Sequence, residues 1–329
     1  MSNSIDTILS IALVTAATAC SSSPAPLSPS DSAPVAGAHR KAYVGLFGDG
    51  AVAVLDTETN AVSKTIPVSA PDGLVLTPDG SKVYVASGDT GSVQVIATST
   101  DGVVATIPVG AKPAGLAISP DGRRLVASVA GANEAVIIDT TSDAVIQRVP
   151  VGLAHASCIS ADSRQAYVGS QATGAPAIVR VALDADTPPV SFDVDKSPRM
   201  LSCTADKVYF TAVGLDAVEV MDAASGALGP AIPSGGSPHD VRASEDGHFE
   251  LIVSQTAGDL EWIDPAAGAV VARLPTGKLP HWIAPSADGQ RAYVTNEGDD
   301  DVAVVDLATR QVIDTIAIGP APRKMAVQR

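Results

Sequence analysis

A repeat of about 42 residues is the feature that most constrains how this chain folds. The sequence has five tyrosines, and they lie 41, 83, 42 and 84 residues apart, so that all of them share one regular spacing. They are Tyr43, Tyr84, Tyr167, Tyr209 and Tyr293. The two vacant places of this spacing fall at Val126 and Leu251, which are also apolar. Such a period indicates repeated supersecondary units, each burying its apolar face against its neighbours.

Two further residue types follow the same period. Prolines occur at Pro71, Pro113, Pro198, Pro238, Pro280 and Pro322, and His155 holds the midpoint of the longest step. An aspartate ends an apolar run at Asp56, Asp139, Asp222, Asp264 and Asp306, with Ala97 and Ala182 in the matching places of two other units. An aspartate in this place is expected to cap the turn that follows it.

Within one unit, apolar and polar residues alternate with the period of two that is typical of half-buried strands. For residues 113–152 we expect strands at 115–119, 124–128, 135–138 and 144–151, with a Pro-Asp-Gly turn at 120–122, a loop at 131–134 and a turn at 139–143. An Asp-Gly pair between apolar runs favours the positive φ values of tight hairpins. Four short antiparallel strands per repeat of this length predict the blade of a β-propeller.

The sequence predicts seven such blades, and therefore an all-β, seven-bladed β-propeller. Six complete units begin at Pro71, Pro113, His155, Pro198, Pro238 and Pro280. The chain enters the remaining unit at residues 41–43, already in a second strand, and ends at 322–327 in a first strand without a successor. We expect this C-terminal strand to join the N-terminal blade, which closes the ring and leaves no free sheet edge between the two blades.

One unit carries a motif that points to a family. The run Tyr293-Val294-Thr295-Asn296, together with Pro-Asp-Gly hairpins and a Val-Val-Asp-Leu-Ala-Thr turn, resembles the YVTN-repeat (YncE-like) family of β-propellers. The other units vary it as Tyr-Val-Gly, Tyr-Val-Ala or Tyr-Phe-Thr, and the resemblance covers about residues 41–329. It implies the propeller fold, but the family shares no catalytic motif, so it implies neither catalytic residues nor a cofactor.

The first 38 residues differ from the repeats. Residues 8–19 are mainly apolar and run into Ala17-Thr18-Ala19-Cys20, but a membrane span needs about 20 apolar residues. We interpret residues 1–20 as a signal peptide ending in a sequence that resembles a bacterial lipobox, with Cys20 as the lipidated residue. The segment MSNSIDT before it has no Lys or Arg, so a plain secretion signal or a misassigned start is the alternative.

Residues 21–38 are rich in Ser, Pro and Ala, a composition that predicts a disordered tether between the lipid and a propeller at 39–329. We therefore expect a monomeric protein of the cell envelope, held to a membrane by its lipid alone. It would be a periplasm-facing or surface lipoprotein, or secreted if the lipobox is not used. The net charge of −15 and the pI of about 4.5 argue against nucleic acid as a partner, because phosphate binding needs a basic face.

The two remaining cysteines are Cys158 and Cys203, both in first strands. Counted from the repeat proline place, they lie three and five residues along, so both side chains are expected on the same side of their blades. This favours two buried free thiols over a disulfide or a metal pair. The sequence contains no CxxC and no HExxH, so it predicts no metal site of those types.

The candidate site follows from the propeller geometry, in which first strands are innermost and begin at one mouth of the central channel. The residues directly after the proline place converge there: Asp72, Ala114, Ala156, Arg199, His239, His281 and Arg323, with His155 in the proline place itself. Lys112, Lys196, Lys278 and Lys324 lie one or two places away, and acidic loops open on the same face at Asp49, Asp89, Glu134, Asp216, Asp259, Glu297 and Asp299–Asp301. We expect a cationic mouth inside an anionic collar.

The candidate ligand-binding residues are Asp72, Arg199, His239, Asp240, His281 and Arg323. Arg199 and Arg323 suit a carboxylate or phosphate. His239 and His281 are alternatively a metal pair, with Asp240 or Asp72 as a third ligand. The plain alternative is that these are hydrated polar groups without a ligand, as we expect for the acidic turn Asp299–Asp301. The repeat tyrosines, Trp262 and Trp282 are expected to pack in the core.

These observations favour a non-enzymatic, lipid-anchored propeller that binds a protein or a small anionic ligand at the channel mouth, with no catalytic residue and no cofactor. The alternative is an enzyme, since related propellers include lactonases, lyases and quinoprotein or haem-bearing dehydrogenases. His239 and His281 would then act as acid and base or as metal ligands. A structural surface protein is the third hypothesis, and no Gly-x-Ser-x-Gly elbow supports a hydrolase.

Overall fold

The computed structural model describes residues 40–185, 187–244 and 247–328. These residues form 28 β-strands and one short 3-10 helix, η1 (Ala130–Ala132), within the compact unit His39–Arg329. The expected signal peptide, the lipidated Cys20 and the tether lie outside the described residues. In the part of the chain that the structure describes, no helix is long and apolar enough to cross a membrane.

The strands are arranged as seven antiparallel sheets of four, which we number as blades 1 to 7. Blade 1 consists of β28 (Pro322–Val327), β1 (Lys41–Leu46), β2 (Ala51–Asp56) and β3 (Ala61–Pro67). Blade 2 has β4 (Pro71–Leu76), β5 (Lys82–Ser87), β6 (Ser92–Ala97) and β7 (Gly102–Pro108). Blade 3 has β8 (Pro113–Ile118), β9 (Arg124–Val129), β10 (Glu134–Asp139) and β11 (Ala144–Pro150).

The other four blades follow in chain order. Blade 4 has β12 (Ala154–Ile159), β13 (Gln165–Ser170), β14 (Ala177–Ala182) and β15 (Val190–Asp193). Blade 5 has β16 (Pro198–Cys203), β17 (Lys207–Ala212), β18 (Ala217–Asp222) and β19 (Ile232–Pro233). Blade 6 has β20 (Pro238–Ala243), β21 (Glu250–Ser254), β22 (Asp259–Asp264) and β23 (Ala269–Pro275). Blade 7 has β24 (Pro280–Pro285), β25 (Arg291–Asn296), β26 (Asp301–Asp306) and β27 (Gln311–Ala317).

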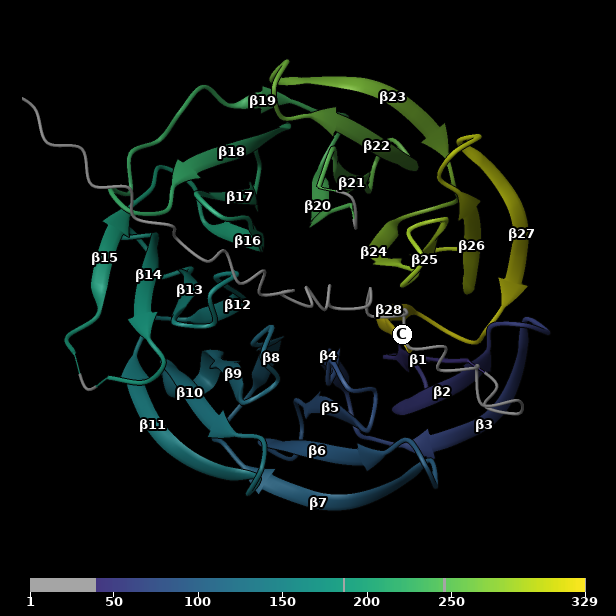
Figure 1. The fold of residues 1–329 in the computed structure, drawn as a ribbon, viewed down its shortest axis with the longest axis horizontal. Helices are drawn as coiled ribbons and strands as arrows, with labels where there is room; N and C mark the ends of the chain where they lie inside the picture. Colours follow the sequence, from purple (N-terminus) through teal and green to yellow (C-terminus); the bar gives the residue numbers. More distant parts are fainter. Residues whose placement is uncertain (1–39, 186, 245–246, 329) are drawn as a thin grey trace, which may run out of the picture. The chain divides into compact units, whose positions relative to one another are not determined.

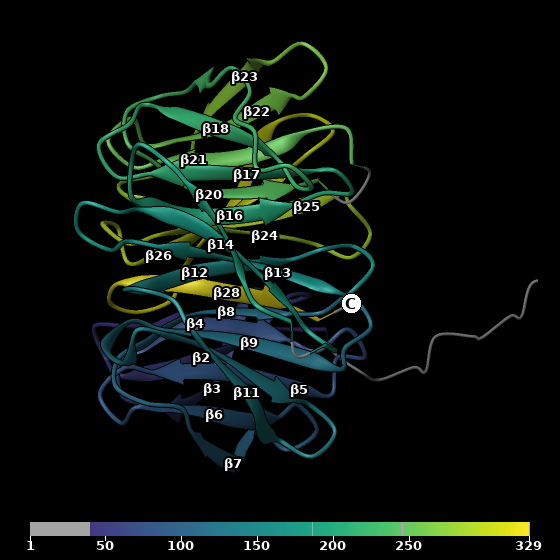
Figure 2. The same cartoon turned by 90° about the vertical axis from the view of Figure 1, so that its left-hand side faces the viewer.

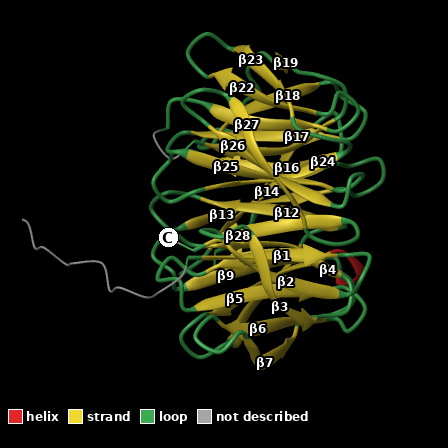
Figure 3. Ribbon diagram, turned by 90° about the vertical axis from the view of Figure 1, so that its right-hand side faces the viewer, coloured by secondary structure: helices red, strands yellow, loops and turns green. Residues whose placement is uncertain are grey.

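The blades form a closed ring with the first strand of each blade innermost and the fourth outermost (Figure 1). Seen from the side, the inner strands run roughly along the axis of the ring and the loops gather at its two faces (Figures 2 and 3). The ring closes as expected, because β28 pairs with β1 from Ala42↔Val327 to Leu46↔Pro322. This confirms the all-β, seven-bladed propeller that the repeat predicted.

Strand formation follows the local sequence closely in blade 3. Its four strands cover the four predicted segments to within a few residues, and the expected loop contains η1. The predicted Pro-Asp-Gly turn holds Gly122 at a φ of 74°, where a side chain would be strained.

The core lies between blades rather than within them, since the sheets present buried faces to each other. One cluster, for example, joins Tyr84 and Val95 of blade 2 to Leu125 and Ile138 of blade 3.

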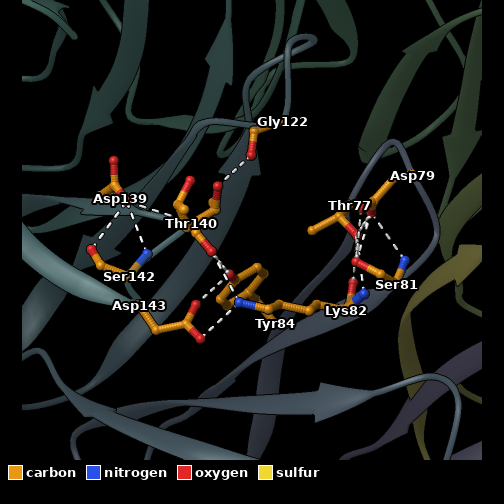
Figure 4. A network of polar contacts seen from close by, with 11 residues as sticks. Thr77, Asp79, Ser81, Lys82, Tyr84, Gly122, Asp139, Thr140, Ser142 and Asp143 are labelled. Carbon is orange, nitrogen blue, oxygen red and sulfur yellow. Dashed lines mark hydrogen bonds and ion pairs between the residues drawn. The ribbon is translucent and has the colours of Figure 1, made fainter.

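The repeat tyrosines pack in this core, as expected, with 0 to 6% of their surface exposed. Three of them, Tyr43, Tyr84 and Tyr167, also donate a hydrogen bond to the next blade, and Figure 4 shows the contact of Tyr84. The hydroxyl of Tyr84 in blade 2 donates to Asp143 Oδ1 of blade 3 (2.6 Å), and Lys82 Nζ reaches Asp143 Oδ2 (2.8 Å). Lys41 and Tyr43 of blade 1 hold Asp101 of blade 2 in the same way. We call this Lys-x-Tyr to Asp contact the inter-blade clamp.

The structure corrects the position assigned to His155. In blade 4 the residue in the proline place is Ala154, because Ala154 pairs with Ser170 as Pro71 pairs with Ser87 in blade 2. His155, and not Ala156, therefore follows the proline place. The prediction assumed that blades 3 and 4, between Pro113 and Pro198, have equal lengths. The loops on either side of β14 in blade 4 are longer than the corresponding loops of blade 3, so blade 4 begins one residue earlier than predicted.

The same one-residue shift makes the prediction of free thiols wrong. Cys158 and Cys203 form a disulfide with a Cα–Cα distance of 5.5 Å. Counted from Ala154 and Pro198, the two cysteines lie four and five places along β12 and β16. Successive strand residues point to opposite faces, so these two side chains face each other across the gap between blades 4 and 5. The disulfide joins these neighbouring blades.

Candidate functional site

Seven side chains occupy the place after the proline place, one from each inner strand, at the same mouth of the channel. They are Asp72, Ala114, His155, Arg199, His239, His281 and Arg323. A β-bulge lies at this point of the inner strands: in blade 2, Pro71 is opposite Ser87 but Leu74 is opposite Val85. Bulges re-aim side chains at functional sites, and here they place both the second and the third residue of the strand at the channel.

The histidines of this ring contact one another. The rings of His239 and His281 have centroids 4.0 Å apart, and Nδ1 of His239 donates to the carbonyl oxygen of His281 (2.9 Å). His155 Nδ1 donates likewise to the carbonyl of Arg199 (3.0 Å). Burial and the neighbouring cations hold the pKa of His239 and that of His281 well below the ordinary value. Both imidazoles are therefore neutral at physiological pH. Among the described residues, Nδ1 of the buried His281 has no hydrogen-bond partner.

The two histidines do not assemble into the metal site considered as an alternative. Asp240 is fully buried, but its Oδ2 accepts from Arg242 Nε (3.2 Å) and from the backbone N–H of Ile283 (3.1 Å). Within residues 40–328, apart from the three that the structure leaves out, no three His, Cys, Asp or Glu side chains are grouped as metal ligands. Burial raises the pKa of Asp240, opposed by the Arg242 charge.

The two candidate arginines lie three blades apart and have different surroundings, so they do not form one bidentate site for a carboxylate or phosphate. Arg323 is paired with Glu297 (3.1 Å), and its guanidinium carbon lies 3.7 Å from the ring centre of Phe47. Arg199 donates to Ser237 Oγ (3.3 Å), and burial lowers its pKa, opposed by the more distant Glu297. In the described part of the chain, Arg199 has no carboxylate within 4.0 Å.

A buried charged residue that is not among the six candidate ligand-binding residues is Lys324, in the third place of β28. Its side chain is 4% exposed. Nζ lies 3.7 Å from the ring centre of Trp282 and 3.2 Å from Met200 Sδ. Burial lowers the pKa of Lys324 to about 7, against an opposing contribution from Asp240. A charged residue inside an inner strand, directly after the rim residue, was the available signal.

Below the rim, the third-place side chains fill the channel unevenly. Met200, Asp240, Trp282 and Lys324 stand on one side, while the same place in blades 2 and 3 is Gly73 and Gly115. A Cβ at Gly73 would collide with the carbonyl oxygen of Ala114, and one at Gly115 with that of His155. Since these strands approach each other so closely, only glycine fits there.

An open cavity of about 900 Å³ lies at the mouth beside the two glycine-bearing strands. Asp72, Lys112 and His155 line it together with Phe47 and Asp89. The candidate residue Asp72 therefore faces open space, whereas His239, His281 and Asp240 are buried and do not line this cavity. A volume of this size suits a small-molecule ligand.

The charges of the mouth agree in part with the expected cationic ring and acidic collar. The inner strands hold four Arg or Lys, namely Arg199, Arg242, Arg323 and Lys324, against Asp72 and Asp240, although the whole chain has a net charge of −15. Arg242, in the fifth place of β20, lies away from this mouth, in a cavity that Pro78 and Pro120 also line. Several collar carboxylates cap the backbone instead of facing a ligand. Asp299 accepts from the N–H of Lys278 (2.8 Å) and Asp300 from that of Ala321 (2.9 Å).

Solved structures with the same fold come from proteins with different names. Hydrazine synthase of Kuenenia stuttgartiensis matches at 19% identity and a TM-score of 0.73, over 81% of this chain and 92% of that one. A protein described as a 6-phosphogluconolactonase-type protein of Bacteroides uniformis matches at 18% and 0.70, over 88% and 99%. Apo AztD of Citrobacter koseri matches at 14% and 0.63, over 88% and 97%. At these identities the likeness shows the fold alone.

No curated protein sequence matches the chain. A family model does: the model described as YNCE-like beta-propeller matches residues 5–327. This range includes all seven blades, and the motif at 293–296 lies within it. The chain belongs to the YNCE-like β-propeller family.

Proposed function

We propose that this propeller is a non-enzymatic binding protein whose ligand is a small anion, or an anionic group of a partner, at the channel mouth. The observation that carries the proposal is the excess of Arg and Lys on the inner strands of an otherwise acidic chain. Lys324 is buried and Arg199 is half-buried, and among the described residues neither has a carboxylate within 4.0 Å. A cationic channel with low-dielectric walls attracts anions.

The ligand would enter through the cavity beside blades 2 and 3. There Lys112 can donate hydrogen bonds to an anionic group, and Nε2 of His155, whose Nδ1 donates to the carbonyl of Arg199, can accept one from a hydroxyl group of the ligand. Asp72 and Asp89 can accept hydrogen bonds from hydroxyl or amide groups of the same ligand, and Phe47 offers an apolar wall. Such a ligand is therefore an acid with a polar, hydroxyl-bearing body rather than a purely apolar one.

The proposed location is outside the cytoplasm, on a lipid anchor at Cys20. The disulfide between Cys158 and Cys203 supports this, because disulfides form and persist in oxidising compartments. We expect the full-length protein to fractionate with membranes and to incorporate labelled fatty acid. The Cys20→Ser variant should lose both properties while its propeller stays folded. Equal labelling of the two proteins would exclude the lipid anchor.

The binding proposal is tested by calorimetric titration of the protein with inorganic phosphate and with gluconate. Lys112→Ala removes a lining cation from the cavity, and we expect the affinity to fall about tenfold, since charge-assisted bonds contribute about 1.5–3 kcal/mol. Lys196→Ala is the matched control, because Lys196 lies on the same face outside the cavity. Equal affinities for the two variants, or no heat with either anion, would contradict the proposal.

An enzyme is the second candidate, and one observation favours it. Lys324, His239, His281 and Asp240 all have displaced pKa values and lie on neighbouring inner strands, a property that active sites share. Because one structural neighbour is described as a 6-phosphogluconolactonase-type protein, hydrolysis of 6-phosphogluconolactone is the assay to use. Turnover by the wild type that Lys324→Met abolishes would favour the enzyme, and no turnover would favour the binding protein.

A further inference from the structure

The junction between blades 6 and 7 differs from its counterpart between blades 2 and 3. Each residue at the junction of blades 6 and 7 lies 167 residues after its counterpart at the junction of blades 2 and 3, a distance that corresponds to four repeats. The inter-blade clamp of Lys82, Tyr84 and Asp143 crosses the junction of blades 2 and 3 (Figure 4). At the junction of blades 6 and 7, the same three places hold Phe249, Leu251 and Arg310. No member of the clamp is retained there.

A cavity of about 560 Å³ lies at this junction, on the face opposite the candidate channel mouth, and a cavity of about 480 Å³ lies at the same place between blades 2 and 3. The replacement therefore changes the lining of the cavity. Phe249, Leu251 and Trp262 form its apolar wall, and Arg310 lies at its edge. Leucine has no hydroxyl, so Leu251 packs in an apolar cluster with Ile283 and Ala292 of blade 7 but donates no hydrogen bond to that blade. Leu307 takes the place of Thr140, whose hydroxyl bonds the carbonyl oxygen of Gly122 at the other junction. The lining of this cavity is thus less polar than that of its counterpart between blades 2 and 3.

Arg310 occupies a backbone position that does not favour arginine. Its φ is 54°, in the left-handed region, where Asn, Asp and Gly are the usual residues. The same turn position holds Asn60, Asp101 and Asp143 in blades 1 to 3, and Gly226 and Gly268 in blades 5 and 6. An arginine is therefore kept against the conformational preference of this position.

The guanidinium of Arg310 points over the aromatic wall. Its central carbon lies 5.6 Å from the ring centre of Phe249 and 5.4 Å from that of Trp262. In the part of the chain that the structure describes, no carboxylate comes within 4.0 Å of it. Asp288 also lines the cavity, but its Oδ1 accepts from Ser286 Oγ and from the N–H of Gln290, so this carboxylate caps its own turn.

We propose that the cavity between blades 6 and 7 binds a small aromatic carboxylate. The carboxylate would pair with the planar guanidinium of Arg310. The aromatic body would lie against Phe249, Leu251 and Leu307, with the volume of the cavity fitting a ligand of one or two rings. The charge of Arg310 selects against aromatic cations. This site is separate from the channel mouth and does not depend on the function proposed for it.

The test uses phenylacetate as the probe, with NMR detection of the indole N–H signals. The chain has two tryptophans, and a Trp262→Phe variant assigns the two signals. We expect phenylacetate to shift the Trp262 signal in a saturable way and to leave the Trp282 signal in place. Benzyl alcohol, which lacks the carboxylate, should bind at least about tenfold more weakly. A shift of the Trp282 signal alone, or no shift at all, would overturn the proposal.

Arg310→Asn is the decisive variant, since Asn60 occupies the same turn position in blade 1 with a φ of 54°. The folded state should keep its melting temperature, while the affinity for phenylacetate falls about tenfold or more. Arg123→Asn is the matched control, because it removes one positive charge from an exposed position in the turn of blade 3. It should leave the affinity for phenylacetate unchanged. Unchanged affinity in Arg310→Asn, or an equal loss in Arg123→Asn, would refute the assignment.

A second variant tests the site by replacing Arg310 and the apolar wall of the cavity. This triple variant carries the residues of the inter-blade clamp of blades 2 and 3 at the junction of blades 6 and 7: Phe249→Lys, Leu251→Tyr and Arg310→Asp. We expect this protein to be at least as stable as the wild type and to give no phenylacetate response at the Trp262 signal. Retained binding by a folded triple variant would place the ligand elsewhere and refute the proposal.

Discussion

Replacing Lys324 by methionine should stabilise the protein at neutral pH and remove part of its pH dependence. The ammonium group is 4% exposed, and its closest contacts are the Trp282 ring and Met200 Sδ, neither of which carries a counter-charge. Burial lowers the pKa of Lys324 from an ordinary value of 10.5 to about 7. Methionine has a similar length and no charge, so it keeps the apolar contacts of the side chain.

The magnitude follows from the pKa. A displacement from 10.5 to about 7 means that the folded state disfavours the ammonium form by about 5 kcal/mol. Between these two pH values the unfolded state binds more protons than the folded state, so the free energy of unfolding of the wild type rises with pH. The penalty is complete below pH 7 and disappears towards pH 10.5. Because Asp240 loses a neighbouring cation in the variant, we expect a net gain of about 3 kcal/mol at pH 7.

The assay is urea unfolding of the oxidised wild type and of Lys324→Met at pH 7, 8 and 9. The stability advantage of the variant should shrink by about 1.4 kcal/mol between pH 8 and pH 9. Taking the difference between the two proteins cancels the titration of all shared groups. Lys64→Met, at an exposed position on β3, should show no such trend. A difference that does not change between pH 7 and pH 9 would show that Lys324 keeps its proton and would refute the reasoning.

Three further outcomes are expected. Tyr84→Phe should lower the free energy of unfolding by about 1–3 kcal/mol, and a double-mutant cycle with Asp143→Asn should show coupling between the two side chains that form a 2.6 Å hydrogen bond. Cys158→Ala should cost about 2–4 kcal/mol in non-reducing urea titrations, because the disulfide closes a loop with a sequence separation of 45. The ring signals of His239 and His281 should stay in the neutral form down to pH 5 in NMR titrations, since the pKa of each is well below its ordinary value. Because the unfolded state takes up these protons and the folded state does not, stability should fall as pH drops below about 6.5.

Each of these outcomes can fail in a specific way. An uncoupled double-mutant cycle would show that the clamp contact does not stabilise the junction of blades 2 and 3. If Cys158→Ala and the wild type unfold at the same urea concentration, the disulfide does not constrain the unfolded chain. Histidine signals that titrate near pH 6.5 would show that the rim of the channel is open to solvent.

The sequence was sufficient for the number of blades, their strands and the closure of the ring. These features depend on interactions within one repeat, such as the two-residue alternation of apolar and polar residues and the turn chemistry of Asp-Gly pairs. The repeat of about 42 residues occurs seven times, so the same pattern is found in each unit. It also placed Asp72, Arg199, His239, His281 and Arg323 at one end of the inner strands, where the structure finds them.

The tertiary structure alone decided how these side chains meet. Longer loops in blade 4 moved the register by one residue, and this turned two expected free thiols into the disulfide between Cys158 and Cys203. The bulge in each inner strand brought the third residue to the channel, which buried Lys324 against Trp282. Contacts between blades join residues far apart in the chain, so a single residue of register decides which groups face each other, and the periodicity of one repeat does not contain that information.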